Sequence, residues 1–172
     1  MNKQIALENL KEAVDILNKN NLYWWIDAGT CLGAIRDKDF IDHDTDTDVA
    51  MLYPDDEVRD QLIADMVASG FELIHIFGKK NCGLEYAFKK NGEKIDFFFY
   101  DIEKGKGLLN RKDGITMSIW KRGERIILDF PLYLFNELKQ IDFLGLKVNV
   151  PNPPEEYLNV RYGDWQKAVE GS

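Results

Sequence analysis

The stretch Ile41-Asp-His-Asp-Thr-Asp-Thr-Asp-Val-Ala-Met51 has an aspartate at every second position, directly before an apolar run that predicts a buried strand. In an extended backbone successive side chains point to opposite faces, so the four aspartates are expected on one face and Thr45 and Thr47 on the other. Neighbouring carboxylates about 6–7 Å apart would repel by roughly 2–3 kcal/mol per pair, a cost that a divalent cation reverses. The pattern therefore favours a metal site over a solvated acidic loop. The aspartate series consists of Asp42, Asp44, Asp46 and Asp48.

Length and composition limit the class of protein. The chain has 172 residues, 45% of them hydrophobic, which predicts one domain spanning residues 1–172. A net charge of -8 opposes binding to nucleic acid or to anionic membranes. No apolar run reaches the length of a membrane span, and the N-terminus resembles no targeting peptide. Cys31 and Cys82 do not suggest a disulfide scaffold, so we expect a cytoplasmic protein.

The segment before the aspartate series predicts a possible anion site. Apolar residues at helical spacing predict a helix over residues 3–18, and residues 22–28 read as a short strand. Gly29 and Thr30 then turn the chain into a helix over residues 31–37. A strand, a glycine turn and a helix start present backbone N–H groups to a phosphate, although such a glycine is also ordinary turn chemistry.

The segment after the series predicts a strand over residues 49–53, a helix from Pro54 that Gly70 ends, and a strand over residues 71–77. His75 shares a face of this last strand with Phe71, Leu73 and Phe77. We therefore interpret it as a core or interface histidine and not as a ligand.

Residues 84–100 predict a β-hairpin, because Asn91-Gly92 is a preferred two-residue turn. The turn sets the register and pairs Ala87 with Asp96. A carboxylate on an otherwise aromatic strand is costly unless it is paired, protonated or bound to metal. An ion pair and a metal site both fit Asp96 at this point.

The rest of the chain predicts strands over residues 114–120 and 125–130, a helical turn within 131–139, and a tight turn around Gly145. Asn152 is the expected cap of a last helix that Gly163 ends. A basic cluster between these elements suggests either a phosphate-facing wall or a solvated hairpin and loop. Its members are Lys104, Lys106, Arg111, Lys112, Lys121, Arg122 and Arg125.

Together these motifs predict phosphoryl or nucleotidyl transfer. Asp46, Asp48 and Asp96 would hold one or two Mg²⁺ (or Mn²⁺) ions, and the turn at Gly29 and Thr30 would hold the phosphates that those ions neutralise. One carboxylate, best assigned to Asp96, would accept the proton of an attacking hydroxyl.

Three ordered motifs also resemble a known family. The segment from Trp25 to Met51 is similar to the signature of the LicD and fukutin-like proteins, Gly-Gly-Thr-Leu-Leu-Gly-Ala-Val-Arg followed by Phe-Ile and Asp-Ile-Asp. Residues 94–100 resemble the strand of that family that bears its third aspartate. Residues 150–165 resemble its C-terminal Pro, Tyr-Leu and Tyr-Gly-Asp-Trp motifs, so the resemblance covers about residues 24–165.

The resemblance implies an α+β fold, a nucleotidyltransferase-like mixed β-sheet flanked by helices in a single compact domain. Members of the family move a phospho-alcohol, such as phosphocholine or ribitol phosphate, from a CDP-alcohol donor to a glycan hydroxyl. Carried over by position, the metal ligands are Asp46, Asp48 and Asp96, the phosphate turn is Gly29 and Thr30, and Arg36 is a candidate phosphate contact.

The chain departs from the family pattern at Ala28, at Asp39 and at Asp42-His43, all on the rim of the expected site. The resemblance therefore does not identify the donor alcohol or the acceptor. Many relatives are longer, so we expect acceptor recognition to be either reduced in this chain or supplied by a protein partner.

Three alternatives remain open. The chain could transfer a nucleoside monophosphate from an NTP donor to a small-molecule hydroxyl acceptor, as antibiotic-modifying enzymes do. It could be a non-catalytic calcium-binding module, although an EF-hand loop starting at Asp44 lacks the required glycine and glutamate, with Val49 and Asp55 in those places. It could also bind nucleotide without turnover.

Overall fold

The fold is built around one mixed sheet. The computed structural model describes residues 1–80, 82–104, 113–121 and 124–167. Side chains are described for all of these residues except residue 82 and those within 101–127. Within these residues, a hairpin of β8 (Lys139–Phe143) and β9 (Leu146–Val150) forms a second, two-stranded sheet. The strands are β1 (Trp24–Ile26), β2 (Asp46–Leu52), β3 (Glu72–Lys79), β4 (Cys82–Lys90), β5 (Glu93–Lys104), β6 (Asp113–Lys121), β7 (Glu124–Pro131), β8 (Lys139–Phe143) and β9 (Leu146–Val150).

Strand β5 organises the main sheet. The order is β1-β2-β5-β4-β3, and the last third of β5 also pairs with β6, which pairs with β7. Strand β2 runs parallel to β5, and every other pair is antiparallel. The parallel register sets Asp48 opposite Asp96 and Asp46 opposite Lys94. Strands β2 and β5 are distant in sequence, but the pairing places their charged residues side by side.

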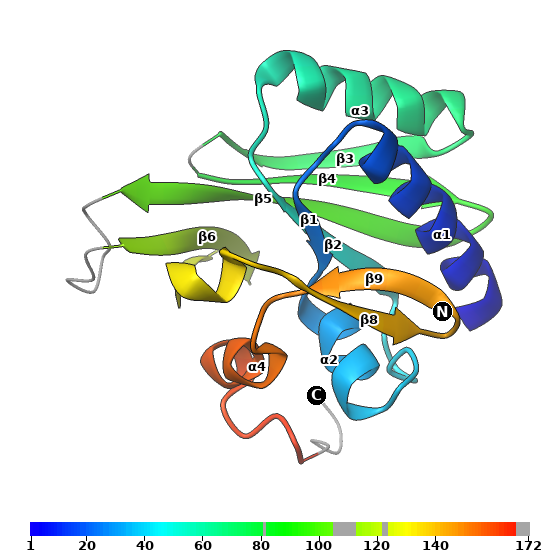
Figure 1. Ribbon diagram of the computed structural model, residues 1–172. Coiled ribbons are helices and arrows are strands. Elements are labelled where there is room, and N and C mark those ends of the chain that lie inside the picture. Colours follow the sequence, from blue (N-terminus) through cyan, green and yellow to red (C-terminus); the bar gives the residue numbers. More distant parts are fainter. Residues whose placement is uncertain (81, 105–112, 122–123, 168–172) are drawn as a thin grey trace.

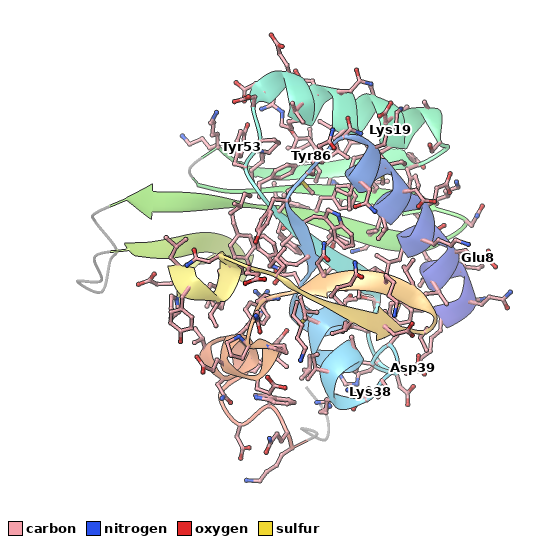
Figure 2. The ribbon with its side chains drawn as sticks, in the orientation of Figure 1. Glu8, Lys19, Lys38, Asp39, Tyr53 and Tyr86 are labelled. Carbon is pink, nitrogen blue, oxygen red and sulfur yellow. The ribbon has the colours of Figure 1, made fainter. Side chains whose placement is uncertain are left out.

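The helices lie in two groups (Figure 1). Helices α1 (Lys3–Lys19) and α3 (Asp56–Ala68) contact each other and the sheet. The second group lies in the lower half of Figure 1 and consists of α2 (Ala28–Arg36), the short 3₁₀ helix η1 (Leu132–Phe135) and α4 (Pro154–Tyr162). Figure 2 shows Glu8 on the outer side of α1, and Tyr53 and Tyr86 below α3. None of the helices in the described part of the chain has both the length and the apolar character needed to cross a bilayer.

An aromatic cluster fastens α4 to the sheet. Trp25 of β1 lies 5.1 Å from Tyr100 of β5 and 4.8 Å from Phe135 of η1, measured between ring centroids. Phe130 of β7 stacks on Tyr157 of α4 at 5.2 Å. These rings are buried, so they contribute both apolar burial and about 0.5–1.5 kcal/mol per favourable ring pair. The cluster holds the C-terminal helix beside the start of α2.

Several sequence-based predictions are confirmed. The mixed α+β sheet is present, and the β4–β5 hairpin has the predicted register, with Lys90 opposite Glu93 and Ala87 opposite Asp96. Gly163 follows the last residue of α4, as expected. The basic cluster predicted within residues 104–125 lies outside the described side chains.

Other details are corrected. Strand β2 begins at Asp46 and not at residue 49, because pairing with β5 starts there. The cap of α4 is Pro153 and not Asn152. His75 is exposed and not in the core, because β3 is an edge strand with a bulge between Leu73 and His75.

Candidate active site

The start of α2 is capped from the neighbouring strand. Asp27 stands at the N-cap but makes no side-chain cap hydrogen bond. Instead, the backbone N–H groups of Gly29 and Thr30 donate to Oδ2 of Asp48 at 3.0 and 3.4 Å. The N–H of Asp48 donates in return to Oγ1 of Thr30 at 2.8 Å. This exchange starts the helix at Ala28, three residues before the predicted start, and joins the predicted phosphate turn to a predicted metal ligand.

Gly29 allows a close approach that another residue would block. A Cβ atom at Gly29 would lie 2.3 Å from Oδ2 of Asp44. Asp44 is therefore packed against the first turn of α2, and burial, followed by the charge of Asp46, raises the pKa of Asp44. Ala28, which precedes this glycine, has a φ of 41°, a conformation that favours glycine. The turn is tight on both sides of the Asp48 contact.

The three predicted metal ligands lie side by side on β2 and β5. Asp48 and Asp96 are direct neighbours across the parallel ladder, and Asp46 is two residues before Asp48 on the same face. A side chain that the sequence did not single out lies between them. Nζ of Lys94 is 3.0 Å from Oδ2 of Asp46 and 3.5 Å from Oδ2 of Asp96. Oδ1 of Asp96 is buried and has no hydrogen-bond partner.

Burial raises the affinity of Asp48 and Asp96 for protons. Asp48 is 8% exposed and Asp96 is 5% exposed. Burial, followed by the charge of Asp46, holds the pKa of Asp48 well above its usual range. Burial likewise raises the pKa of Asp96 to about 6, although Lys94 opposes the shift. For Lys94 burial lowers the pKa, but the carboxylates of Asp46 and Asp96 outweigh it and the net pKa is raised.

Glu85 is a further acid that the sequence analysis missed. It lies on β4 opposite Phe98, which places it diagonally across from Asp96 on the same face. Burial, followed by the charge of Asp96, raises the pKa of Glu85 to about 7. The predicted hairpin register could have identified Glu85, because a residue two places before Ala87 must share the face of Asp96. Lys94 could have been found in the same way from its place two residues before Asp96.

The carboxylates of Asp46, Asp48 and Asp96 are not arranged around one point in this structure. Among the described residues, no group of three or more His, Cys, Asp or Glu side chains is arranged to hold a metal ion. The ammonium of Lys94 lies between Asp46 and Asp96, which accounts for part of this arrangement. The donor set still fits a hard divalent cation, because it consists of carboxylate oxygens and leaves Oδ1 of Asp96 without a partner.

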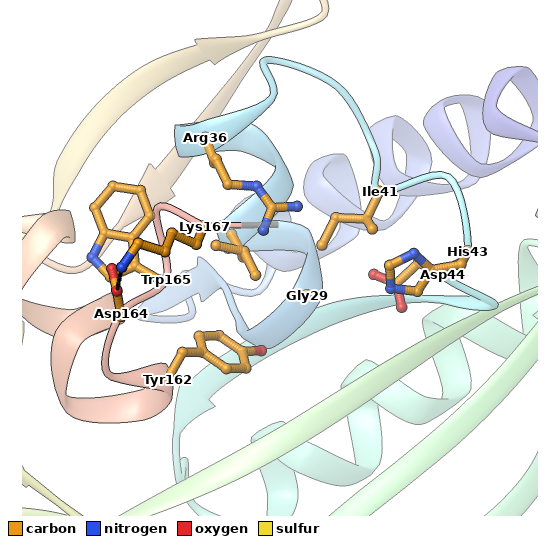
Figure 3. Close-up of a pocket in the computed structure, with 10 residues that line it drawn as sticks. Gly29, Arg36, Ile41, His43, Asp44, Tyr162, Asp164, Trp165 and Lys167 are labelled. Atoms are coloured by element: carbon orange, nitrogen blue, oxygen red, sulfur yellow. Dashed lines mark hydrogen bonds and ion pairs between the residues drawn. The ribbon is translucent and has the colours of Figure 1, made fainter. Parts of the chain in front are cut away.

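A pocket of about 260 Å³ opens beside the start of α2 (Figure 3). One face of α2, at Gly29, Leu32 and Arg36, forms one wall. The opposite wall comes from the end of α4 and the segment after it. Its lining residues there are Tyr162, Asp164, Trp165 and Lys167, and the loop before β2 adds Ile41, His43 and Asp44. The pocket thus combines aromatic rings and cations and reaches the Asp44 side of the carboxylates.

The ends of this pocket differ in chemistry. Arg36 is seven residues after Gly29, about 10 Å along the helix, and its Nε and Nη2 donate to the carboxylate of Asp37 at 2.8 Å each. It therefore lines the far end of the pocket and not the phosphate turn. Asp42 does not belong to the site, because its side chain is exposed and pairs with Lys3 at 2.7 Å. The aspartate series divides, and only Asp46 and Asp48 belong to the strand.

A second buried cluster lies behind the first turn of α2. Asp27 is fully buried, and its Oδ2 accepts hydrogen bonds from Tyr100 Oη at 2.9 Å and Arg161 Nη1 at 3.4 Å. Its Oδ1 accepts a hydrogen bond from Tyr157. The backbone N–H of Asp27 donates to the carbonyl of Asp48 at 3.0 Å. This cluster ties α4 to the strand that carries the site.

Comparison with protein families identifies the domain. Residues 21–153 match the family model described as LicD/FKTN/FKRP, nucleotidyltransferase domain. The chain belongs to the LicD/FKTN/FKRP family. The human protein named ribitol-5-phosphate transferase FKTN is 32% identical over 170 residues, which cover 98% of this chain and 34% of that protein. The FKTN of Macaca fascicularis gives the same values. An uncharacterized protein of Rickettsia prowazekii is 29% identical over 96% of this chain and 57% of its own length.

Solved structures agree on the fold of this LicD/FKTN/FKRP domain. A crystal structure of ANT(2'')-Ia in complex with adenylyl-2''-tobramycin has a TM-score of 0.51 at 15% identity, covering 83% of this chain and 66% of that chain. A solution structure of ANT(2'')-Ia has a TM-score of 0.54 at 13% identity, covering 95% of this chain and 80% of that chain. The predicted nucleotidyltransferase-like architecture is confirmed. The chain spans about a third of the length of its FKTN relatives.

Within the family fold, the structure brings together most of the predicted site. Gly29, Thr30 and Asp48 are joined by hydrogen bonds, and Asp46 and Asp96 are bridged by Lys94. Arg36 lies apart from them along α2. Metal binding and the roles of these residues stay predictions.

Proposed function

We propose that this domain is a metal-dependent transferase that moves a phospho-alcohol from a CDP-linked donor to a hydroxyl of a glycan. The main support is the meeting of two features on the interior strands β2 and β5 of the sheet. The carboxylates of Asp46, Asp48 and Asp96 lie together there, and the N-terminus of α2 begins against Asp48. Family membership and the similarity to FKTN favour a phospho-alcohol over other phosphorus-containing groups.

In this proposal Asp46, Asp48 and Asp96 hold Mg²⁺ or Mn²⁺, which supplies neutralisation of the donor phosphates when bound. The nucleoside of the donor occupies the pocket beside α2, where the exposed ring of Tyr162 offers a stacking surface. Its phosphates then lie near Gly29 and the carboxylates. The acceptor approaches from the β4 side, where the residue opposite Asp96 is the small Ala87.

The chain's own residues also account for the proton. The acceptor oxygen forms a bond to the phosphorus that carries the alcohol, the bond from that phosphorus to the bridging oxygen breaks, and CMP leaves. Asp96 accepts the acceptor proton. In the metal-free protein burial raises the pKa of this carboxylate to about 6, so it is ionised at neutral pH and can act as an acceptor.

The test is product analysis with matched donors. The protein is incubated with Mg²⁺ and CDP-choline, CDP-ribitol or CDP-glycerol, and separately with each NTP, with sugar alcohols and oligosaccharides as acceptors. Phosphorus NMR and mass spectrometry should show CMP from a CDP-alcohol, and D48N should abolish it. Pyrophosphate release from an NTP with transfer of the nucleoside monophosphate would replace this proposal with a nucleotidyltransferase function, which the ANT(2'')-Ia fold also accommodates.

A further inference from the structure

Lys94 is placed by the sheet itself and not by a flexible loop. It stands directly opposite Asp46 across the parallel ladder and two residues before Asp96 on the same strand. Its side chain therefore shares their face. Its ammonium contacts one oxygen of each, at 3.0 and 3.5 Å. The residue thus lies between the two strands that supply the predicted metal ligands.

One ammonium compensates only part of the negative charge. The contact to Asp96 is long, and the other oxygen of Asp96 is buried without a partner. Asp48 makes its contacts with backbone N–H groups. A divalent ion carries twice the charge and accepts six or more oxygen ligands, so it would compensate this set better than Lys94 does. The Lys94 side chain is 35% exposed, and its stem is flexible enough to turn aside.

We propose that Lys94 is the resident counter-ion of the metal-free site, holding Asp46 and Asp96 together until a divalent cation displaces it. The inference rests on the proposed metal-dependent function and adds a competition to it. Because Lys94 must leave before the metal binds, the free protein binds metal weakly. The donor phosphates supply further ligands, so metal enters together with the donor.

Two substitutions separate contact from general charge. Lys94→Met keeps the length of the side chain and removes the ammonium. Lys89→Met removes the same charge from an exposed lysine directly opposite Lys94 on β4 and is the matched control. Mn²⁺ and Mg²⁺ affinities are measured by calorimetry without donor, and melting temperatures are measured in EDTA and in saturating Mg²⁺.

We expect K94M to bind Mn²⁺ at least about tenfold more tightly than the wild type, because it neither competes with nor repels the ion. K89M should change the affinity by less than about threefold, since its charge is solvated. In EDTA, K94M should melt about 4–8 °C below the wild type, and Mg²⁺ should close that gap. If K94M folds only with metal, that result also supports the counter-ion role.

A third variant guards against a general loss of structure. Lys94→Arg keeps the cation and should leave both metal affinity and the melting temperature in EDTA near the wild-type values. Equal metal affinity of wild type and K94M, or no metal binding by any variant, would overturn the inference. Metal binding that follows the expected order without CMP release from any CDP-alcohol would overturn the proposed function and leave the inference intact.

Discussion

Asp27, directly after β1, and Asp96, on β5, are both buried aspartates, yet their surroundings differ. Asp27 has hydrogen bonds to both oxygens, from Tyr157 to Oδ1 and from Tyr100 and Arg161 to Oδ2. Asp96 has one long contact with Lys94 and one buried oxygen without a partner. A carboxylate with all its partners inside the fold is a structural element, whereas one that lacks partners is suited to bind something from outside. The comparison separates the frame of the site from its reactive part.

The largest effect should follow substitution in the carboxylate site. Asp46→Asn or Asp48→Asn is expected to lower CMP release at least about 1,000-fold, equivalent to about 4 kcal/mol, because each removes a charged metal ligand. Thermal stability without metal should not fall, since repulsion between neighbouring carboxylates is relieved. Asp42→Asn is the control, because Asp42 is exposed and pairs with Lys3 away from the site. Turnover retained in both site variants would contradict the assignment.

The opposite result is expected for the satisfied cluster. Asp27→Asn should destabilise the fold by about 3 kcal/mol, because it removes a buried negative charge that faces the buried guanidinium of Arg161. Urea unfolding measures the change. Tyr157→Phe removes one hydrogen bond to the same carboxylate and should cost about 1 kcal/mol. An Asp27→Asn protein as stable as the wild type would remove the distinction between the two regions.

The pH dependence of stability should follow Asp96. Its pKa in the fold is about 6, above the usual 3.8, so the folded state binds the proton more tightly than the unfolded chain. Stability without metal is therefore full below about pH 4 and falls as the pH rises through 6. The contribution of Asp96 is about 2–3 kcal/mol.

Urea unfolding in EDTA at pH 4 and pH 8 measures this loss, and Asp96→Asn should reduce it. Glu85, with a pKa raised to about 7, and Asp48, with a pKa held well above its usual range by burial, add losses that persist in the variant. An identical difference between the two pH values in wild type and Asp96→Asn would show that Asp96 is not the titrating group.

The smallest effect is expected where the two regions meet on α4. Arg161 belongs to the satisfied cluster, whereas its neighbour Tyr162 is 43% exposed and lines the pocket. Tyr162→Ala should raise the donor KM about fivefold, equivalent to about 1 kcal/mol of lost stacking, with little change in kcat or stability. Val160→Ala, at a residue of the same helix with similar exposure, is the control. Equal KM values for the two variants would exclude Tyr162 from donor binding.

Short sequence motifs were enough to predict the β4–β5 hairpin and part of the site. The Asn91-Gly92 turn fixed the pairing of Ala87 with Asp96, because a two-residue turn leaves only one register. Alternating aspartates before an apolar run located the start of β2 within three residues. These predictions succeeded because the interactions that determine them lie within about ten residues of sequence.

Contacts between distant segments account for what was missed. The first turn of α2 is capped by Asp48, nineteen residues after Gly29, so turn chemistry alone placed the helix start too late. The partners of Asp27 lie up to 134 residues away, and nothing local to β1 indicates them. The prediction that His75 lies in the core rested on the apolar residues that share its strand face. The edge position and the bulge of β3 instead leave His75 in solvent.

The parallel pairing of β2 with β5 has a consequence for the length of the chain. The segment between Asp48 and Asp96 holds α3, β3 and β4, and it leaves the site and returns to it. Residues can be added or removed at its turns without changing which carboxylates are neighbours, because the ladder alone sets that pairing. A search that requires a fixed interval between these two aspartates would therefore miss proteins whose sites are the same, and the strand register is the better criterion.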